Sequence, residues 1–284
     1  MSLLNCQRCG LGVPDSVEKC PTCGHYAGPP NVRAARGADE VTALNRRYEE
    51  AVERSKAGGS YPQLIWLEEE AKASFAVVNV GLDFLFHFVT NDKQLYSTYS
   101  LATRGQIRKP ASRSNEEDRL AVEAKLFGGY GDEIRYAALS ADGSGVKSYG
   151  AFTLRLRDIA ISDRATLLEV NSFDFVEKHG IGVRGRPPNG YRAAWEDRHR
   201  LVVAKLAGRI SPSTSRAELP TMLLRSEGDR ATDDFVEVHI FGTFDINAVE
   251  SVTGDSSRLS KDEQAMLSIV KAQLLKLGKA WIEE

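Results

Sequence analysis

Four cysteines near the N-terminus have the residue type and the spacing of a metal site. They form two Cys-x2-Cys pairs separated by ten residues, and a glycine follows each pair. Such knuckles direct both thiolates at one tetrahedral ion, while the glycine relieves backbone crowding. Disulfides are the alternative, which we do not expect in a chain without a secretion signal. The spacing predicts a structural zinc ribbon over residues 1–28, with the ligands Cys6, Cys9, Cys20 and Cys23.

A single carboxylate, Glu237, stands in a segment that alternates like a half-buried strand. A carboxylate among aromatic side chains is desolvated, and this costs free energy unless the group has a partner. The sequence identifies no specific buried partner nearby, so we expect a catalytic carboxylate lining a cleft. The alternative is a structural carboxylate that reaches the rim or forms a salt bridge with a neighbouring arginine. The two expected faces are Val236, Val238 and Ile240 on one side, and Phe235, Glu237, His239 and Phe241 on the other.

These residues need a scaffold, and hydrophobic periodicity predicts an α+β fold. Helices are expected over 39–57, 62–78, 92–104, 193–206 and 260–281, the last opened by a Ser-x-x-Glu capping box. Strands are expected over 82–90, 133–139, 149–157, 164–170 and 234–242. We therefore expect a zinc ribbon (1–28), a helical pair (38–80) and an α+β domain (81–284) that ends in a helix packed on its core.

Composition narrows the class of protein. The formal net charge of −2 excludes a globally basic nucleic-acid-binding protein, so contact with nucleic acid would need a local patch. No apolar run approaches the roughly 20 residues that span a bilayer, and the first residues lack the features of a signal peptide. We expect a cytoplasmic protein without membrane contact. The sequence contains neither a P-loop nor an HExxH motif.

Three segments of the α+β domain, in order, resemble the ADP-ribosyltransferase superfamily. The segment 86–90 (FHFVT) is similar to a first core strand whose histidine contacts the ribose of NAD. The segment 142–150 (DGSGVKSYG), with the strand after it and Arg-Ala-Thr at 164–166, is similar to the central portion of toxin transferases. The segment 234–242 (DFVEVHIFG) is similar to the final strand, which bears the catalytic glutamate.

This resemblance implies a split-sheet core and specific roles for residues. Glu237 would stabilise the oxocarbenium-like centre formed when the nicotinamide–ribose bond breaks, and it would bind the ribose 2′-OH. Tyr149 or Tyr130 would stack on the nicotinamide, and His87 would hold a ribose or the nicotinamide amide. Phe235 stands where an Arg-modifying Glu-x-Glu loop has its first carboxylate, so arginine is not the expected acceptor. The residues expected to bind NAD are His87, Thr90, Tyr130, Ser148 and Tyr149.

The resemblance and the ribbon together imply a toxin or effector that modifies DNA or RNA, as in phage defence and toxin–antitoxin systems. An antitoxin or chaperone protein would be its partner. The polar segment 104–113 could bind phosphates, although a solvated loop explains its composition equally well. The alternative function is a non-catalytic zinc-ribbon adaptor for nucleic acid or protein. The candidate phosphate-binding residues are Arg104, Arg108, Lys109 and Arg113.

Overall fold

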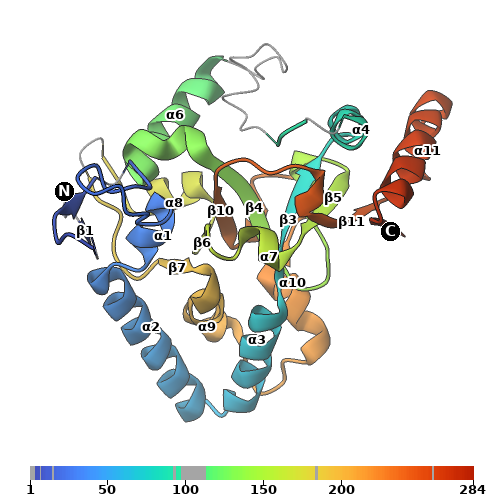
Figure 1. The fold of residues 1–284 in the computed structure, drawn as a ribbon. Coiled ribbons are helices and arrows are strands. Elements are labelled where there is room, and N and C mark those ends of the chain that lie inside the picture. The colour runs from blue at the N-terminus through green and yellow to red at the C-terminus, as the bar shows by residue number, and fades with distance from the viewer. Residues whose placement is uncertain are drawn as a thin grey trace.

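The computed structural model describes residues 4–6, 8–14, 16–91, 94–96, 113–182, 185–257 and 259–284. Within them, an eight-stranded sheet has the order β12-β11-β5-β3-β4-β10-β6-β7 (Figure 1). Neighbouring strands are antiparallel except β11 and β12, which are parallel. The strands are β3 (Phe75–Val80), β4 (Ile134–Ser140), β5 (Phe152–Leu156), β6 (Ala165–Leu168), β7 (Arg192–Ala194), β10 (Glu237–Phe241), β11 (Val249–Gly254) and β12 (Ala280–Glu283).

Two short strand pairs lie outside this sheet, and helices cover it. The pairs are β1 (Leu4–Asn5) with β2 (Gly12–Val13), and β8 (Leu224–Arg225) with β9 (Asp234–Phe235). The helices are α1 (Pro30–Ala35), α2 (Ala38–Ala57), α3 (Tyr61–Ala73), α4 (Leu82–Thr90), α6 (Arg113–Phe127), α7 (Asp158–Ile161), α8 (Ser172–Lys178), α9 (Arg198–Leu206), α10 (Leu219–Leu223) and α11 (Lys261–Lys276). The α+β class is therefore confirmed, with a mixed sheet and flanking helices.

The two faces of the sheet are packed differently. One face carries the main core, in which Leu154 and Val238 meet side chains from α2, α3, α4, α9 and α11. The helix α9 packs against both α2 and α3, which Figure 1 shows on either side of it. The opposite face is covered by two smaller apolar clusters. One, around Phe127 and Phe175, lies under α6 and α8, and the other surrounds Phe75.

The C-terminal helix begins at the predicted cap and packs on the main core, but it ends earlier than predicted. Ser260 and Glu263 form the capping box, with each side chain bonded to the other residue's backbone N–H. Val270 and Leu274 are buried in the main core, whereas Leu277 is 37% exposed. The helix ends before Gly278, whose φ of 67° suits glycine. Trp281, which we had expected at the end of the helix, therefore lies in β12.

The strand predicted over 82–90 is a helix, α4. The aromatic residues at 84, 86 and 88 alternate as in a strand, but the buried positions are Leu82, Leu85, Phe88 and Val89, which follow helical spacing. The strand that enters the sheet is the preceding segment, β3, which we had placed at the end of a helix over 62–78. That helix, α3, ends at Ala73. His87 and Thr90 are consequently exposed residues of a helix.

Two other predicted helices coincide with the described structure only in part. The helix predicted over 193–206 begins at Arg198, because residues 192–194 form the edge strand β7 and a 3-10 turn follows. Most of the helix predicted over 92–104 lies outside the described residues, and Tyr96 within it forms a β-bridge with Phe244. Arg104, Arg108 and Lys109 also lie outside the described residues. Arg113 begins α6, and its side chain is outside the described part.

Candidate functional site

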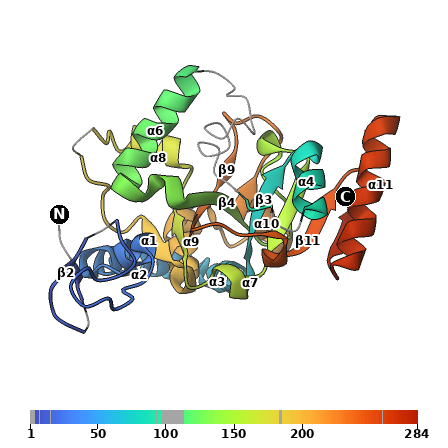
Figure 2. The same ribbon diagram turned by 45° about the horizontal axis from the view of Figure 1, so that its top comes forward.

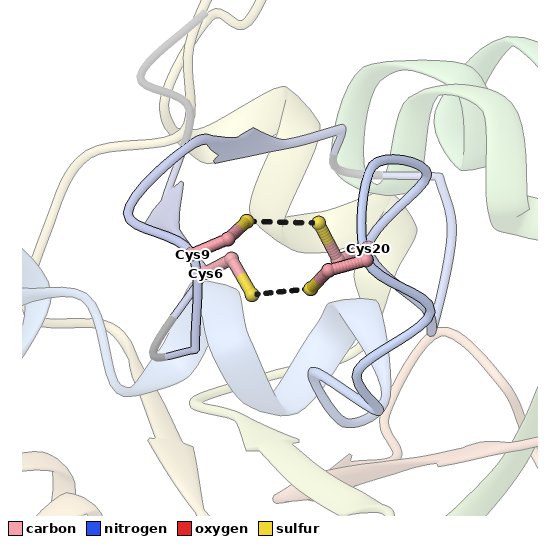
Figure 3. A group of neighbouring side chains, drawn as sticks. Cys6, Cys9 and Cys20 are labelled. Carbon is pink, nitrogen blue, oxygen red and sulfur yellow. Dashed lines mark hydrogen bonds between the residues drawn. The ribbon is translucent and has the colours of Figure 1, made fainter.

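The four cysteines lie together in the first part of the chain. The Sγ atoms of Cys6 and Cys23 are 3.6 Å apart, as are those of Cys9 and Cys20, and all four lie within 4.8 Å of one another (Figure 3). Four thiolates at about 2.3 Å from one tetrahedral ion are about 3.8 Å apart, whereas a disulfide bond is about 2.05 Å long. The arrangement fits a closed tetrahedral metal site and not a pair of disulfides.

The backbone around each cysteine pair has the same hydrogen bonds. In the first turn the Cys6 N–H donates to the Leu11 carbonyl at 2.7 Å, and the Gly10 N–H donates to the Cys6 carbonyl at 2.9 Å. The second turn repeats both bonds at the equivalent positions. Gly10 and Gly24 have φ values of 73° and 68°, a conformation that side chains with a Cβ rarely adopt. The glycine in each motif is therefore required by the turn.

The thiols interact strongly, as metal ligands do. The backbone N–H of Cys23 is the main cause that lowers the pKa of the Cys20 thiol to about 6. The N–H of Leu11 acts in the same direction on Cys9, but burial and the other thiols outweigh it and raise the pKa of Cys9 to about 12. Thiolates this close to one another repel, so the arrangement favours a compensating positive charge. A divalent ion bound between them supplies that charge.

The second candidate site is built around Glu237, the first residue of β10. Glu237 is flanked by Ala138 on β4 and Leu168 on β6, and its side chain is 7% exposed. The predicted alternation is confirmed, because Val238 and Ile240 belong to the main core on the other face of the sheet. On its own face of the sheet, Glu237 lies between the two smaller apolar clusters, and its polar side chain separates them.

Glu237 has buried partners, contrary to our expectation from the sequence. Its Oε2 atom accepts hydrogen bonds from the Ser172 backbone N–H at 2.9 Å and from the Ser172 hydroxyl. The same oxygen lies 2.9 Å from Nε2 of His239. Among the described residues, no group donates to Oε1. The carboxylate is thus fixed through one oxygen, and the other is left for a further donor. We call Glu237, Ser172 and His239 the Glu237 cluster.

The cluster differs from a serine–histidine–acid relay. In such a relay the two ring nitrogens of the histidine contact different partners, the serine and the acid. Here Nε2 of His239 contacts both Glu237 and Ser172, at 2.9 and 3.2 Å. The Ser172 hydroxyl also donates directly to the carboxylate. This geometry holds a carboxylate in place and does not activate a serine nucleophile.

An exposed tyrosine stands at the edge of the cluster. Tyr149 is 44% exposed, and its hydroxyl accepts a hydrogen bond of 3.2 Å from Asn171, the residue before Ser172. Burial, followed by the charge of Glu237, raises the pKa of Tyr149, so the two side chains are electrostatic neighbours. The guanidinium of Arg230 lies 4.8 Å from the centre of the Tyr149 ring.

Ser148 and Asp233 add a polar contact beside Tyr149. The Ser148 hydroxyl donates to Oδ2 of Asp233 at 2.5 Å, while Oδ1 of Asp233 is buried and has no hydrogen-bond partner among the residues that the structure describes. Ser148 directly precedes Tyr149 and therefore lies next to the candidate site, but its hydroxyl is already hydrogen-bonded to Asp233. The unpaired oxygen marks a place where a water molecule or a ligand donor would be favourable.

The other sequence-predicted residues lie elsewhere. Tyr130 is 6% exposed and packs between Phe127 and Phe241, so its ring has no open face for nicotinamide. His87 and Thr90 are exposed on α4, whose buried side chains pack in the main core on the opposite face of the sheet from Glu237. The structure thus brings Tyr149 and Ser148 close to Glu237 and separates His87, Thr90 and Tyr130 from it.

Three residues of the site had no assigned role in the sequence. His239 could have been found, because it is two residues from Glu237 and shares its face by alternation. Ser172 and Asn171 follow β6 and open α8, with the Asn171 side chain capping the Phe173 N–H at 2.9 Å. A capping asparagine is detectable locally, but its position beside Glu237 depends on the pairing of β6 with β10.

Comparison of the chain with protein-family models and with curated proteins found no match. None of the helices in the described ranges has the length and apolar character needed to cross a membrane.

Proposed function

We propose that the protein is an NAD-dependent ADP-ribosyltransferase in which Glu237 is the catalytic carboxylate. The observation that carries the proposal is the asymmetry of this carboxylate. Ser172 and His239 hold Oε2, whereas Oε1 accepts no hydrogen bond from the described residues. A carboxylate oriented in this way is preorganised to face a developing positive charge, which is the largest single contribution to many enzymatic rate enhancements.

Each residue of the cluster would have a defined task. The bond between C1′ of the ribose and the nicotinamide nitrogen breaks, and its electron pair leaves with nicotinamide. The oxygen Oε1 of Glu237 would stabilise the oxocarbenium-like ribose and accept a hydrogen bond from its 2′-OH, while a nucleophile of the acceptor forms the new bond to C1′. Ser172 and His239 would keep the carboxylate from rotating. The exposed Tyr149 ring would stack on nicotinamide.

Two of the three segments that resemble transferases support the proposal. The segment with Ser148 and Tyr149 reaches the cluster through the hydrogen bond between Asn171 and Tyr149, and β6, which contains Ala165 and Thr166, is paired with the Glu237 strand. The segment 86–90 forms α4 and offers no ligand contact near Glu237, so we propose no role for His87 or Thr90. The remaining binding surface would have to come from the edge near Asn171.

We propose zinc as the ion held by the four cysteines, in a structural role. Four thiolates complete a tetrahedron and leave no position for water or substrate, which is typical of structural and not of catalytic zinc. Cysteine knuckles of this kind occur in modules that bind nucleic acid. We therefore propose DNA or RNA as the acceptor class, consistent with a toxin or effector restrained by a partner protein.

The proposal is tested by incubating the protein with labelled NAD and separate pools of DNA, RNA and protein. We expect nicotinamide release and transfer of label to a nucleic-acid pool. Label in the protein pool would leave the enzyme class intact and change the acceptor. If all pools stayed unlabelled and NAD remained intact, the transferase proposal would be wrong.

The second candidate is a non-catalytic adaptor, and one observation favours it. Glu237 is largely buried and has the partners of a structural carboxylate, which could merely join α8 to β10. Ligand-induced thermal stabilisation separates the two functions. Protection by NAD supports the enzyme, whereas protection by nucleic acid without any effect of NAD supports the adaptor.

A further inference from the structure

The short helix α1 connects the four-cysteine module to the Glu237 strand. It begins directly after the module, and it contacts β6, β7 and β10. In Figures 1 and 2 it lies between the N-terminal module and the sheet, on the side away from α11. Two of its polar side chains, Asn31 and Arg33, make the connections in opposite directions.

Arg33 binds the backbone of the module. Its guanidinium donates to the carbonyl oxygens of Val17 at 2.6 Å, Gly28 at 2.9 Å and Pro14 at 2.9 Å. Pro14 and Val17 lie between the two cysteine pairs, and Gly28 lies just after the second pair. The planar guanidinium offers donors in a rigid arrangement, so these three carbonyls converge on it only when the module has its folded conformation.

Asn31 binds the strands at the candidate site. It is 4% exposed, and its Nδ2 atom contacts the His239 carbonyl at 3.1 Å, the Arg164 carbonyl at 3.0 Å and the Thr166 hydroxyl at 3.3 Å. Thr166 lies opposite His239 in the β6–β10 ladder. One buried amide therefore fixes the backbone of His239, the residue whose ring contacts the Glu237 carboxylate.

The ring of His239 has little freedom to move independently of that backbone. It packs edge-on against Phe127 and Tyr136, with ring centres 4.8 and 5.4 Å away, and Nε2 lies 2.9 Å from Glu237. A displacement of the His239 backbone is thus transmitted to the carboxylate. In close-packed interiors such displacements are not absorbed locally.

We propose that Asn31 and Arg33 are positioning residues that make the geometry of the Glu237 cluster depend on the folded, metal-bound state of the four-cysteine module. Loss of the metal releases the carbonyls that hold Arg33, α1 loosens, and Asn31 no longer fixes His239. The catalytic consequence rests on the proposed function. The structural link itself does not, because it is read from the position of His239.

The link is tested by following the histidine ring signals of the full chain by NMR before and after a chelator removes the bound metal. We expect the His239 signals to move on chelation and those of His199, on α9, to stay. The rate of NAD consumption should fall about 10²-fold, the effect of misplacing a catalytic group by about 1 Å. His239 is assigned from the His239→Gln variant.

The variant Arg33→Met provides the decisive comparison, because it retains the four cysteines. Its His239 signals should already be displaced with metal bound, and chelation should move them no further. The control is Arg36→Ala, at the residue directly after α1, which removes an exposed ion pair with Glu196 and should respond to chelation as the parent does. Asn31→Ser should behave as Arg33→Met while still binding one equivalent of metal.

Unchanged His239 signals after metal removal from the parent would overturn the link, and in this experiment a variant serves only to assign the His239 signals. Equal movement of the His199 and His239 signals would also overturn it, because that result indicates general loosening. NAD consumption that is insensitive to chelation and to Arg33→Met would leave the transferase proposal standing without the link. Movement of His239 in a protein that never consumes NAD would leave the link standing without the transferase.

Discussion

The four-cysteine module and the Glu237 cluster are encoded in the sequence in different ways. The module draws its ligands from two adjacent turns, and the same backbone bonds recur in each. The Glu237 cluster combines β10 with the start of α8, and Tyr149 reaches it from a third segment. A site made by local turns can be identified from spacing alone. A site assembled by long-range pairing can be identified only in part.

The largest expected effect concerns the module. Replacing Cys20 with Ser should abolish binding of one metal ion per chain and unfold residues 1 to about 28, because folding of such a module and metal binding are one process. The α+β domain should keep its cooperative melting transition. Metal analysis and hydrogen exchange measure both effects. A Cys20→Ser protein that retains a full equivalent of metal would show that the site is not closed by four thiolates.

Ser172→Ala tests the assembled site. The change removes one of the three groups that contact Oε2 and leaves the backbone N–H in place. We expect the free energy of unfolding to fall by about 1–3 kcal/mol, the usual cost of a buried polar group that loses a partner. Urea denaturation measures it, with the exposed Ser213→Ala as the control. No change in stability would mean that the hydroxyl contact contributes nothing.

Ser260→Ala tests a second locally encoded feature, far from both sites. Loss of the capping box should lower the free energy of unfolding by about 1 kcal/mol. Neither metal binding nor the His239 signals should change. Thermal melting together with the NMR spectrum checks this. If Ser260→Ala moved the His239 signals, the geometry of the Glu237 cluster would depend on global stability. That result would contradict the view that the two features are independent.

An exposed polar cluster near the C-terminus gives the smallest effect. Hydrogen bonds from Ser256, then Trp281 and Lys271, lower the pKa of Glu283 to about 2. Because the folded pKa is below the ordinary value, its contribution to stability is present above about pH 4.3 and is lost as the pH falls through about 2. Glu283→Gln should therefore lower the melting temperature slightly at pH 6 and not at pH 2. An equal shift at both pH values would contradict the assignment.

The sequence predicted the cysteine site, the alternation around Glu237 and the cap of α11, because each depends on neighbours within a few residues. It predicted a strand where α4 forms, since this segment contains two patterns. Its aromatic residues alternate at 84, 86 and 88, while Leu82, Leu85 and Phe88 follow helical spacing. Burial decides between the two patterns, and burial depends on the whole fold. The partnership of Ser172 with Glu237 follows from the pairing of β6 with β10, which no local pattern contains.

The most direct test of the central claim is the rate at which Glu237→Gln consumes NAD. The change keeps the size of the side chain and removes its charge. We expect the variant to fold, to bind NAD within a few-fold of the parent, and to lose roughly 10² or more in rate, the scale of one electrostatic stabiliser. The control Asp262→Asn, at an exposed carboxylate in the first turn of α11, should keep the parent rate. A Glu237→Gln protein that consumed NAD as fast as the parent would contradict the assignment of Glu237 as the catalytic carboxylate.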